Sequence, residues 1–369
     1  MSTTPNSAKA EKNGGLGAFL RGPAGNLLGR FLALIVVFLF FAVLVKGGNF
    51  YSVRNLEAIL RQSCVYATAG LGMTMVIIAA GIDLSAGSLI AISVVAVAWV
   101  LGPADDGSAT AFVLQHPTLA PILAVGVGIL CATLAGLLNG SLVVGLRLMP
   151  FIVTLGSMGM IRGFAKQIAN NKDIYPPPPA DDTWINHLMD PTLTRWIHRW
   201  DSPELAAKTS VWAILPTGIW ILIFGVIASS LFLRYTRLGR HVFAIGSNEE
   251  TARLCGVHVG RTKLFVYTAS GFFCGVAGLM QYSFIDGIGQ PTSAVSYELF
   301  VIASVIIGGA SFNGGEGSIL GTLIGALTIT ILYMGGQQIG WGKPVQEIVI
   351  GAIIIAAAAL DRLRHRKAT

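Results

Sequence analysis

Long apolar segments recur along the whole chain, and they constrain the fold more than any other feature. The first segment is LLGRFLALIVVFLFFAVLV at residues 27–45. Further segments of the same character follow at residues 63–80, 84–102, 119–145, 150–169, 211–233, 264–284, 297–312, 317–335 and 345–360. A helix that crosses a bilayer needs about 20 mostly apolar residues, so the pattern predicts an all-α polytopic membrane protein with about ten transmembrane helices.

The composition agrees with this fold class and disfavours others. Only 12% of the residues are charged, whereas roughly a quarter are charged in an average soluble domain, which argues against a soluble enzyme. The 45 glycines suit packed membrane helices, because glycine lets helix backbones approach closely. The four cysteines, Cys64, Cys131, Cys255 and Cys274, show no metal-ligand spacing, so neither a metal site nor a disulfide framework is expected.

Lysine and arginine residues indicate on which side of the membrane each connection lies, because cytoplasmic connections carry an excess of them. Residues 1–30 and the tail from residue 361 each carry four basic residues and one acidic residue, which gives a net charge of +3. Residues 234–263 carry six basic and two acidic residues, which gives a net charge of +4. Residues 103–118 and 170–208 each carry −2. The two groups fall on opposite faces, so both termini are expected in the cytoplasm. The overall charge of +7 then marks cytoplasmic connections, and no nucleic-acid partner is expected.

The predicted organisation has three parts: a disordered cytoplasmic N-terminus at residues 1–25, a transmembrane domain at 26–362 and a basic cytoplasmic tail at 363–369. Within the domain, residues 170–208 form a long outer loop rich in proline and tryptophan, which we interpret as a stiff interfacial segment without a metal or catalytic role. Residues 51–62, YSVRNLEAILRQ, carry basic side chains on the predicted outer side, and we interpret them as an interfacial helix.

The basic connection at residues 237–263 is long and polar, and it contains a predicted helix. Ser247 or Asn248 can cap a short helix with the sequence EETARLC, and acidic residues in its first turn favour the helix dipole. Gly256 can end this helix. From these physical features alone, a docking element and an ordinary surface helix are equally good interpretations.

The pattern A-x-G-x-N-E-x-x-A-R-x-x-G at Ala244 to Gly256 resembles the coupling loop of monosaccharide importer permeases, the ribose, galactose and xylose type of ATP-binding-cassette transporter. Further motifs extend the resemblance over residues 50–367: GIDLSAGS at 81–88, LLNGSLV at 137–143, PFIVTLG at 150–156, YELFVIASVIIGGASFNGGEGSILGTLIGA at 297–326, and the closing LDRLRHR. Several motifs in the expected order are more specific than any single one. The outer loop is longer and less typical than the rest.

The resemblance implies the membrane subunit of an importer in the bacterial inner membrane. Its implied partners are an ATPase subunit that binds the ATP, a periplasmic sugar-binding protein, and a second permease copy or close homologue within the lipid bilayer. The chain itself is expected to be no enzyme and to hold no cofactor, and it lacks a G-x-x-x-x-G-K-[ST] loop. The ATPase-coupling residues implied by the motif are Gly246, Asn248, Glu249, Ala252, Arg253 and Gly256.

Polar residues within or beside the predicted spans are candidates for the translocation pathway: Asp83, Ser85, Asn139, Thr154, Glu298 and Asn313. Asp83 is an intramembrane carboxylate, which is a functional candidate by default, but it can instead cap the helix that follows it. The glycine-rich break at residues 308–318 resembles the break around Asp83, and such breaks often line a transport path. Other polar groups, including Gln281 and Tyr282, are mostly expected to bond between helices.

Two alternatives remain open at this point. An importer permease for nucleosides or another small polar solute would share these features, because the binding protein sets much of the specificity. An ion-coupled secondary transporter would need several buried carboxylates, whereas Asp83 and Glu298 are the plausible ones here. The sequence does not reveal the sugar, or whether the partner permease is identical.

Overall fold

The computed structural model describes residues 23–102, 115–176, 183–192 and 215–366. In these parts of the chain each predicted span is a helix: α2 (Pro23–Leu44), α3 (Val53–Ile78), α4 (Ala86–Leu101), α6 (Leu119–Gly145), α7 (Pro150–Ile168), α10 (Thr217–Tyr235), α13 (Val259–Phe284), α14 (Tyr297–Ile307), α15 (Ile319–Gln338) and α16 (Lys343–Arg366). The described segments contain no β-strand beyond an isolated bridge between Ile174 and Gly289. The predicted all-α polytopic class is therefore confirmed.

The helices differ in whether they can cross a bilayer alone. Five are long and apolar enough by length and composition: α2, α6, α10, α13 and α15. The apolar helices α4 and α14 are shorter, and α14 has 11 residues. A helix of that length rises about 16 Å, roughly half of the ~30 Å hydrocarbon core. One end of α14 must therefore lie inside the membrane.

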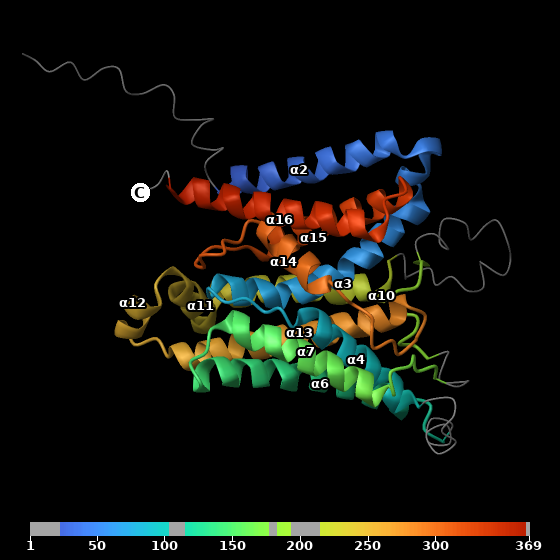
Figure 1. Cartoon of the computed structure of the whole chain (residues 1–369), viewed down its shortest axis with the longest axis horizontal. Coiled ribbons are helices and arrows are strands. Elements are labelled where there is room, and N and C mark those ends of the chain that lie inside the picture. Colours follow the sequence, from blue (N-terminus) through green and yellow to red (C-terminus); the bar gives the residue numbers. More distant parts are fainter. Residues whose placement is uncertain (1–22, 103–114, 177–182, 193–214, 367–369) are drawn as a thin grey trace, which may run out of the picture.

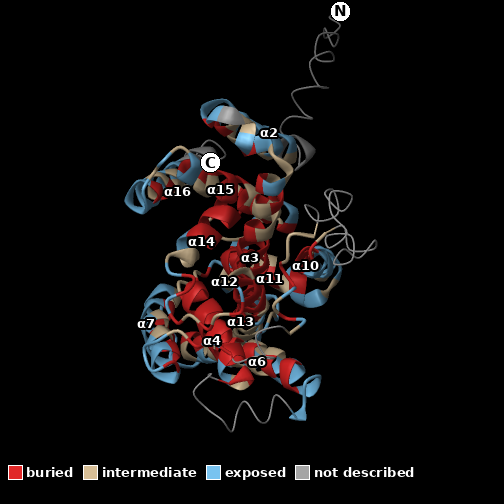
Figure 2. Cartoon of the chain, turned by 90° about the vertical axis from the view of Figure 1, so that its right-hand side faces the viewer, coloured by how far each residue is buried: buried red, intermediate tan, exposed pale blue. Residues whose placement is uncertain are grey.

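The helices run along a common direction and form a bundle around α3 and α13 (Figure 1). Helix α13 packs against α3, α4 and α6, while α15 packs against α2, α3 and α14. Figure 2 shows that buried residues are concentrated on α3, α4 and α13, whereas α2 and α7 present exposed faces. Large apolar side chains such as Phe31 on α2, Phe151 on α7 and Phe224 on α10 are exposed, as expected where a helix meets lipid.

Glycines allow the central helices α6 and α13 to touch through their backbones. A Cβ atom built on Gly136 would lie 2.8 Å from the Cα atom of Gly271, and one built on Gly271 would lie 3.0 Å from the Cα atom of Gly136. Real side chains do not fit at such distances. The glycine-rich composition therefore supports close helix contact here, as expected for membrane helices.

The described helices extend past several of the expected segment limits. Residues 51–62 do not form a separate interfacial helix, because α3 begins at Val53 after a short 3-10 helix, η1 (Lys46–Tyr51). Helix α2 begins at Pro23, so residues 23–25 are helical, while residues 1–22 of the predicted disordered N-terminus lie outside the described residues. Helix α16 continues to Arg366 and includes most of the predicted tail.

The outer loop is described in part, since residues 177–182 and 193–214 lie outside the described residues. Its segment 183–192 packs against the end of α13. The backbone N–H of Met189 donates to the Ser283 hydroxyl at 2.9 Å, and Ile185 and Met189 are fully buried. This part of the loop covers the bundle at the end opposite α11 and α12 (Figure 1).

Candidate functional site

Two helices occupy the connection between α10 and α13 and protrude from one end of the bundle (Figure 1). Helix α11 (Arg237–Ser247) was not predicted, whereas α12 (Glu249–Leu254) is the expected short helix. The side chain of Asn248 caps α12 by accepting the N–H of Thr251 at 2.8 Å. Gly256 ends it with a φ of 83°, and its N–H donates to the Arg253 carbonyl at 3.0 Å. The predicted cap and stop are both confirmed.

A small core and one ion pair hold α12 against the start of α13, and a second ion pair lies within α12. Ile245, Ala252 and Val259 are buried together. The Glu249 carboxylate lies 3.0 Å from the Arg253 guanidinium and 2.6 Å from the Lys263 ammonium. The pair with Lys263 joins α12 to α13, a central helix of the bundle.

The outer surface of α12 is exposed. Among the predicted coupling residues, Asn248, Arg253 and Gly256 are exposed and Glu249 is half-buried, whereas Gly246 and Ala252 are buried. The sequence analysis missed Leu254, whose side chain is 89% exposed at the end of α12. The available signal was an apolar residue in the last turn of an otherwise polar helix. An apolar side chain at the tip of a short helix is suited to docking in a groove of another protein.

Gly246 connects the protruding helices to the two breaks between spans. A Cβ atom on Gly246 would collide with the backbone carbonyl of Ile78 and the backbone nitrogen of Gly315. The N–H of Gly315 donates to the Ile78 carbonyl at 2.8 Å. Ile78 ends α3, and Gly315 lies in the glycine-rich break at residues 308–318. We call the contact among Gly246, Ile78 and Gly315 the Gly246 joint.

Asp83 is the centre of a buried polar network in the break between α3 and α4. One carboxylate oxygen accepts the backbone N–H of Ser85 at 3.0 Å and the Ser85 hydroxyl at 2.5 Å, and the other accepts the Ser270 hydroxyl at 2.9 Å. The Asn139 amide donates to the Ser85 hydroxyl at 2.8 Å. All four side chains are fully buried. The carboxylate thus binds the residue before α4 and also links the break to α6 and α13.

Thr154 completes this network from a fourth helix. Its hydroxyl lies 2.9 Å from the Pro150 carbonyl of its own helix and 3.3 Å from the Ile82 carbonyl, to which the Tyr267 hydroxyl donates at 3.5 Å. The structure therefore brings together four of the six pathway candidates: Asp83, Ser85, Asn139 and Thr154. Their contacts show how α4, α6, α7 and α13 are fixed around one chain break.

The other two pathway candidates lie elsewhere. Glu298 is half-buried in the first turn of α14, and a Cβ atom on Gly87 would collide with its carboxylate. The nearby Arg162 donates to the carbonyls of Ser293 at 2.6 Å and Ala294 at 3.3 Å. Asn313 is exposed in the break at residues 308–318, beside the Gly246 joint.

Within the described residues, no group of His, Cys, Asp or Glu side chains could hold a metal ion. The four cysteines are free. Cys64 and Cys274 are buried in the bundle, and Cys255 is exposed at the end of α12. The described residues of this region therefore provide contacts between helices and hydrogen bonds among buried polar groups.

Comparison with known proteins identifies the family to which the chain is similar. Residues 55–358 match the family described as branched-chain amino acid transport system / permease component. The ribose import permease protein of Escherichia coli K12 is 33% identical over 334 residues, which cover 90% of this chain and 93% of that protein. The galactose/methyl galactoside import permease protein of the same strain is 31% identical over 90% of this chain and 94% of its own length. The fructose import permease protein of Rhizobium meliloti is 31% identical over 90% of this chain and 84% of its own length.

No solved structure matches the chain. The expected resemblance to monosaccharide import permeases is confirmed by these relatives, which are transport components and not enzymes. The apolar helices and the relatives together identify a multi-pass protein of the bacterial inner membrane. The chain belongs to this family of transport-system permease components.

Proposed function

We propose that this chain is the membrane-spanning permease subunit of an ATP-binding-cassette importer for a monosaccharide. The relatives that cover nearly all of the chain carry the names of ribose, galactose and fructose import permeases. A separate ATPase subunit hydrolyses ATP, a periplasmic binding protein delivers the sugar, and a second permease copy or close homologue completes the pathway. No cofactor takes part in this chain's own function.

The observation that carries the coupling role is the rigid, exposed helix α12. It is capped at both ends, tied to α13 by the pair between Glu249 and Lys263, and exposes Leu254 at its tip. We infer that the ATPase subunit binds this tip, so that its closure on ATP moves α12 and α13 together. Such a link couples the two sites mechanically through two states of the bundle.

The orientation of the chain follows from the same proposal. The ATPase is cytoplasmic, so α11 and α12 lie on the cytoplasmic side. The start of α2 and the end of α16 lie at the same end of the bundle as α12 (Figure 1). Both termini are then cytoplasmic, in agreement with the Lys and Arg bias of the connections. The opposite end, with residues 183–192, faces the periplasm.

The proposed function is tested by reconstituting the chain in liposomes with its ATPase and binding protein. Labelled D-ribose, D-galactose and D-fructose, with a nucleoside for comparison, are offered with each component present or omitted. We expect ATP-dependent uptake of one sugar when all components are present. Uptake of the nucleoside alone, or uptake by this chain without the ATPase in an ion gradient, would contradict the proposal.

Replacement of Leu254 by aspartate is expected to uncouple the transporter. The change places a charge where an apolar side chain would enter a groove, and it leaves the buried contacts of Ala252 intact. We expect ATP-dependent uptake of the sugar to fall about tenfold or more, while the amount of permease in the membrane is unchanged. ATP hydrolysis and uptake are measured in the same liposomes.

Leu254→Met is the matched control, because it keeps an apolar side chain of similar volume. Glu249→Arg provides a second, independent test, since it removes both ion pairs and places like charges beside Arg253 and Lys263. It is also expected to uncouple hydrolysis from uptake without preventing insertion. Normal stimulated uptake in both Leu254→Asp and Glu249→Arg would refute the coupling role of α12.

A further inference from the structure

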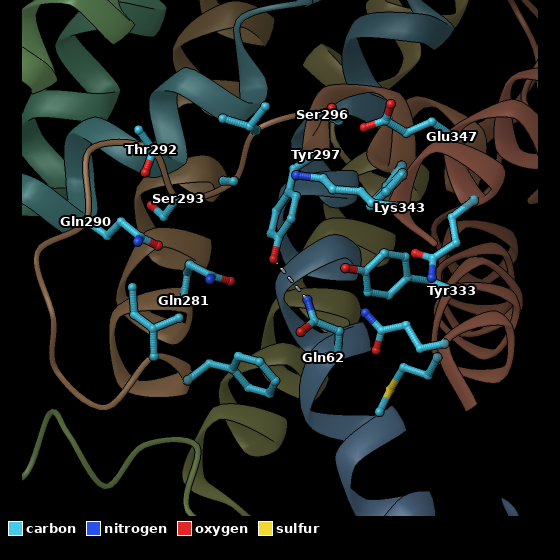
Figure 3. Close-up of a pocket in the computed structure, with 18 residues that line it drawn as sticks. Gln62, Gln281, Gln290, Thr292, Ser293, Ser296, Tyr297, Tyr333, Lys343 and Glu347 are labelled. Atoms are coloured by element: carbon cyan, nitrogen blue, oxygen red, sulfur yellow. Dashed lines mark hydrogen bonds between the residues drawn. The ribbon is translucent and has the colours of Figure 1, made fainter. Parts of the chain in front are cut away.

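A cavity lies at the end of the bundle opposite α12, among α3, α13, α14, α15, α16 and the segment 285–296 (Figure 3). Its volume is 390 Å³, within the roughly 300–1,000 Å³ typical of small-molecule sites. None of the six predicted pathway candidates is among the residues that line it. The cavity is therefore separate from the Asp83 network and from the Gly246 joint.

Three polar atoms of the cavity lining are buried without a hydrogen-bond partner among the described residues. They are the Oε1 atoms of Gln281 and Gln346 and the hydroxyl oxygen of Ser293. These residues are 3%, 2% and 5% exposed, respectively. A buried acceptor without a donor costs about 1–3 kcal/mol, so native proteins rarely keep several in one place. These atoms therefore call for hydrogen-bond donors, from water or from a ligand, that the described residues do not supply.

The side chains approach the cavity from opposite sides. In Figure 3, Gln281, Gln290 and Ser293 come from one side, Gln62 and Tyr333 come from the other, and Tyr297 lies between them. The amide of Gln62 donates to the Tyr297 hydroxyl at 3.4 Å. The lining therefore places neutral amides and hydroxyls around a shared space.

Aromatic rings of the same lining contact one another. The rings of Tyr297 and Phe300 are stacked, with centroids 5.9 Å apart, and the rings of Phe300 and Tyr333 are 5.5 Å apart. A sugar ring has one face of C–H groups and an edge of hydroxyls. Aromatic faces bind the former and amide or hydroxyl groups bind the latter, so this combination suits a polyhydroxylated ring.

The charges favour a neutral ligand. The charged residues in the lining are Lys343 and Glu347, which are one helical turn apart on α16, and both are exposed. The buried lining contains amides, hydroxyls, aromatic rings and aliphatic groups. A carboxylate, phosphate or ammonium group in the buried part would lack an ionic partner, which makes its transfer from water unfavourable.

The wall formed by residues 291–294 is fixed from outside the cavity. Arg162 on α7 donates to the carbonyls of Pro291 at 3.4 Å, Ser293 at 2.6 Å and Ala294 at 3.3 Å. Tyr297 begins the half-length helix α14, so the cavity lies beside the start of this helix. Arg162 is thus a positioning residue for the wall that carries Ser293.

We propose that this cavity is the site where the permease receives a neutral monosaccharide from the outer side. Gln281, Ser293 and Gln346 accept hydrogen bonds from its hydroxyls, and Tyr297, Phe300 and Tyr333 pack against its ring. The proposal rests on the importer function proposed above. It places the received sugar beside the start of α14, with the Asp83 network outside the site.

Gln281→Leu in the complete transporter tests the proposal. We expect the maximal rate of sugar uptake to fall about tenfold, because the variant removes a buried acceptor at nearly constant volume. The half-saturating sugar concentration is expected to stay unchanged, since the binding protein sets it. Stimulation of ATP hydrolysis by the loaded binding protein is also expected to persist. Gln167→Leu is the matched control, because Gln167 is exposed on α7.

A labelling experiment gives an answer that does not depend on transport. Thr292→Cys, at an exposed residue that lines the cavity beside Ser293, is introduced together with Cys131→Ala and Cys255→Ser, since the other two cysteines are buried. A membrane-impermeant thiol reagent added outside is expected to modify residue 292. We expect the transported sugar to slow this modification and salt of equal osmolarity to leave its rate unchanged.

The outcomes separate this inference from the importer proposal. Absence of ATP-dependent uptake of every sugar by the unmodified complex would refute the importer function itself. Normal uptake by the unmodified complex, with an equal rate for Gln281→Leu and labelling of residue 292 that no sugar slows, would overturn the cavity assignment alone.

Discussion

Replacement of Gly246 by valine is expected to abolish sugar uptake and to lower the amount of folded permease. The added atoms would collide with the backbone of Ile78 and of Gly315, and neither backbone can turn aside as a flexible side chain would. Overpacking of this kind typically costs about 1–3 kcal/mol, and backbone contacts leave little room for relief. This destabilisation affects the Gly246 joint, which connects α11 to both breaks between spans. Uptake and the fraction of monodisperse protein after extraction measure the effect.

Gly159→Val is the matched control for this variant. Gly159 is also a helical glycine, it lies exposed on α7, and a Cβ atom there meets nothing within 4 Å. Its replacement is expected to leave uptake within about twofold, because only helix propensity changes. Gly246→Ala is expected to show an intermediate defect. Equal behaviour of Gly246→Val and Gly159→Val would show that the Gly246 joint does not constrain the protein.

The spans were predictable because the bilayer imposes a length and a composition on each helix. Every apolar segment found in the sequence is a helix in the structure, including α4 and α14, which are too short to cross alone. The start of α3 was missed because it is polar and buried. Glu57 is 1% exposed, and Asn55 is held by a bond from Gln338 at 2.5 Å. A hydropathy pattern assigns such residues to the surface.

The caps of α12 were predictable from the sequence, whereas the distant residues that contact Gly246 were not. Asn248 and Gly256 cap a helix through contacts within a few residues, so the sequence contains all that is needed. The Gly246 joint unites residues 78, 246 and 315, which come from three distant parts of the chain. Only the folded bundle brings them together, so no local pattern could have shown that Gly246 is buried.

The cavity could not be predicted for the same reason. Gln281 was noted as a polar group within a span, and it was expected to bond between helices. Its function as a lining residue depends on Ser293 and Gln346, which approach from other segments. The polar groups that stood out in the sequence, such as Asp83, are those beside glycine breaks. In the structure these groups hold the breaks in place.

Asp83→Ala is expected to destabilise the permease strongly. The change leaves the buried N–H of Ser85 and the hydroxyl of Ser270 without their acceptor, at a cost of about 1–3 kcal/mol for each group. It also removes the bond from Ser270 that links the break to α13. We expect loss of uptake together with a lower temperature of aggregation in detergent, measured by size-exclusion chromatography after heating.

Asp83→Asn separates the bonding of this side chain from its charge. The amide oxygen of asparagine can accept both bonds from Ser85, and its NH₂ group can donate to the Ser270 hydroxyl, which accepts as well as donates. The network is thereby kept while the carboxylate is lost. We expect Asp83→Asn to fold normally and to retain uptake within about threefold, because ATP and not an ion gradient drives the cycle. A folded Asp83→Asn transporter that hydrolyses ATP but moves no sugar would show that the charge itself is needed, and Asp83 would then be a coupling site.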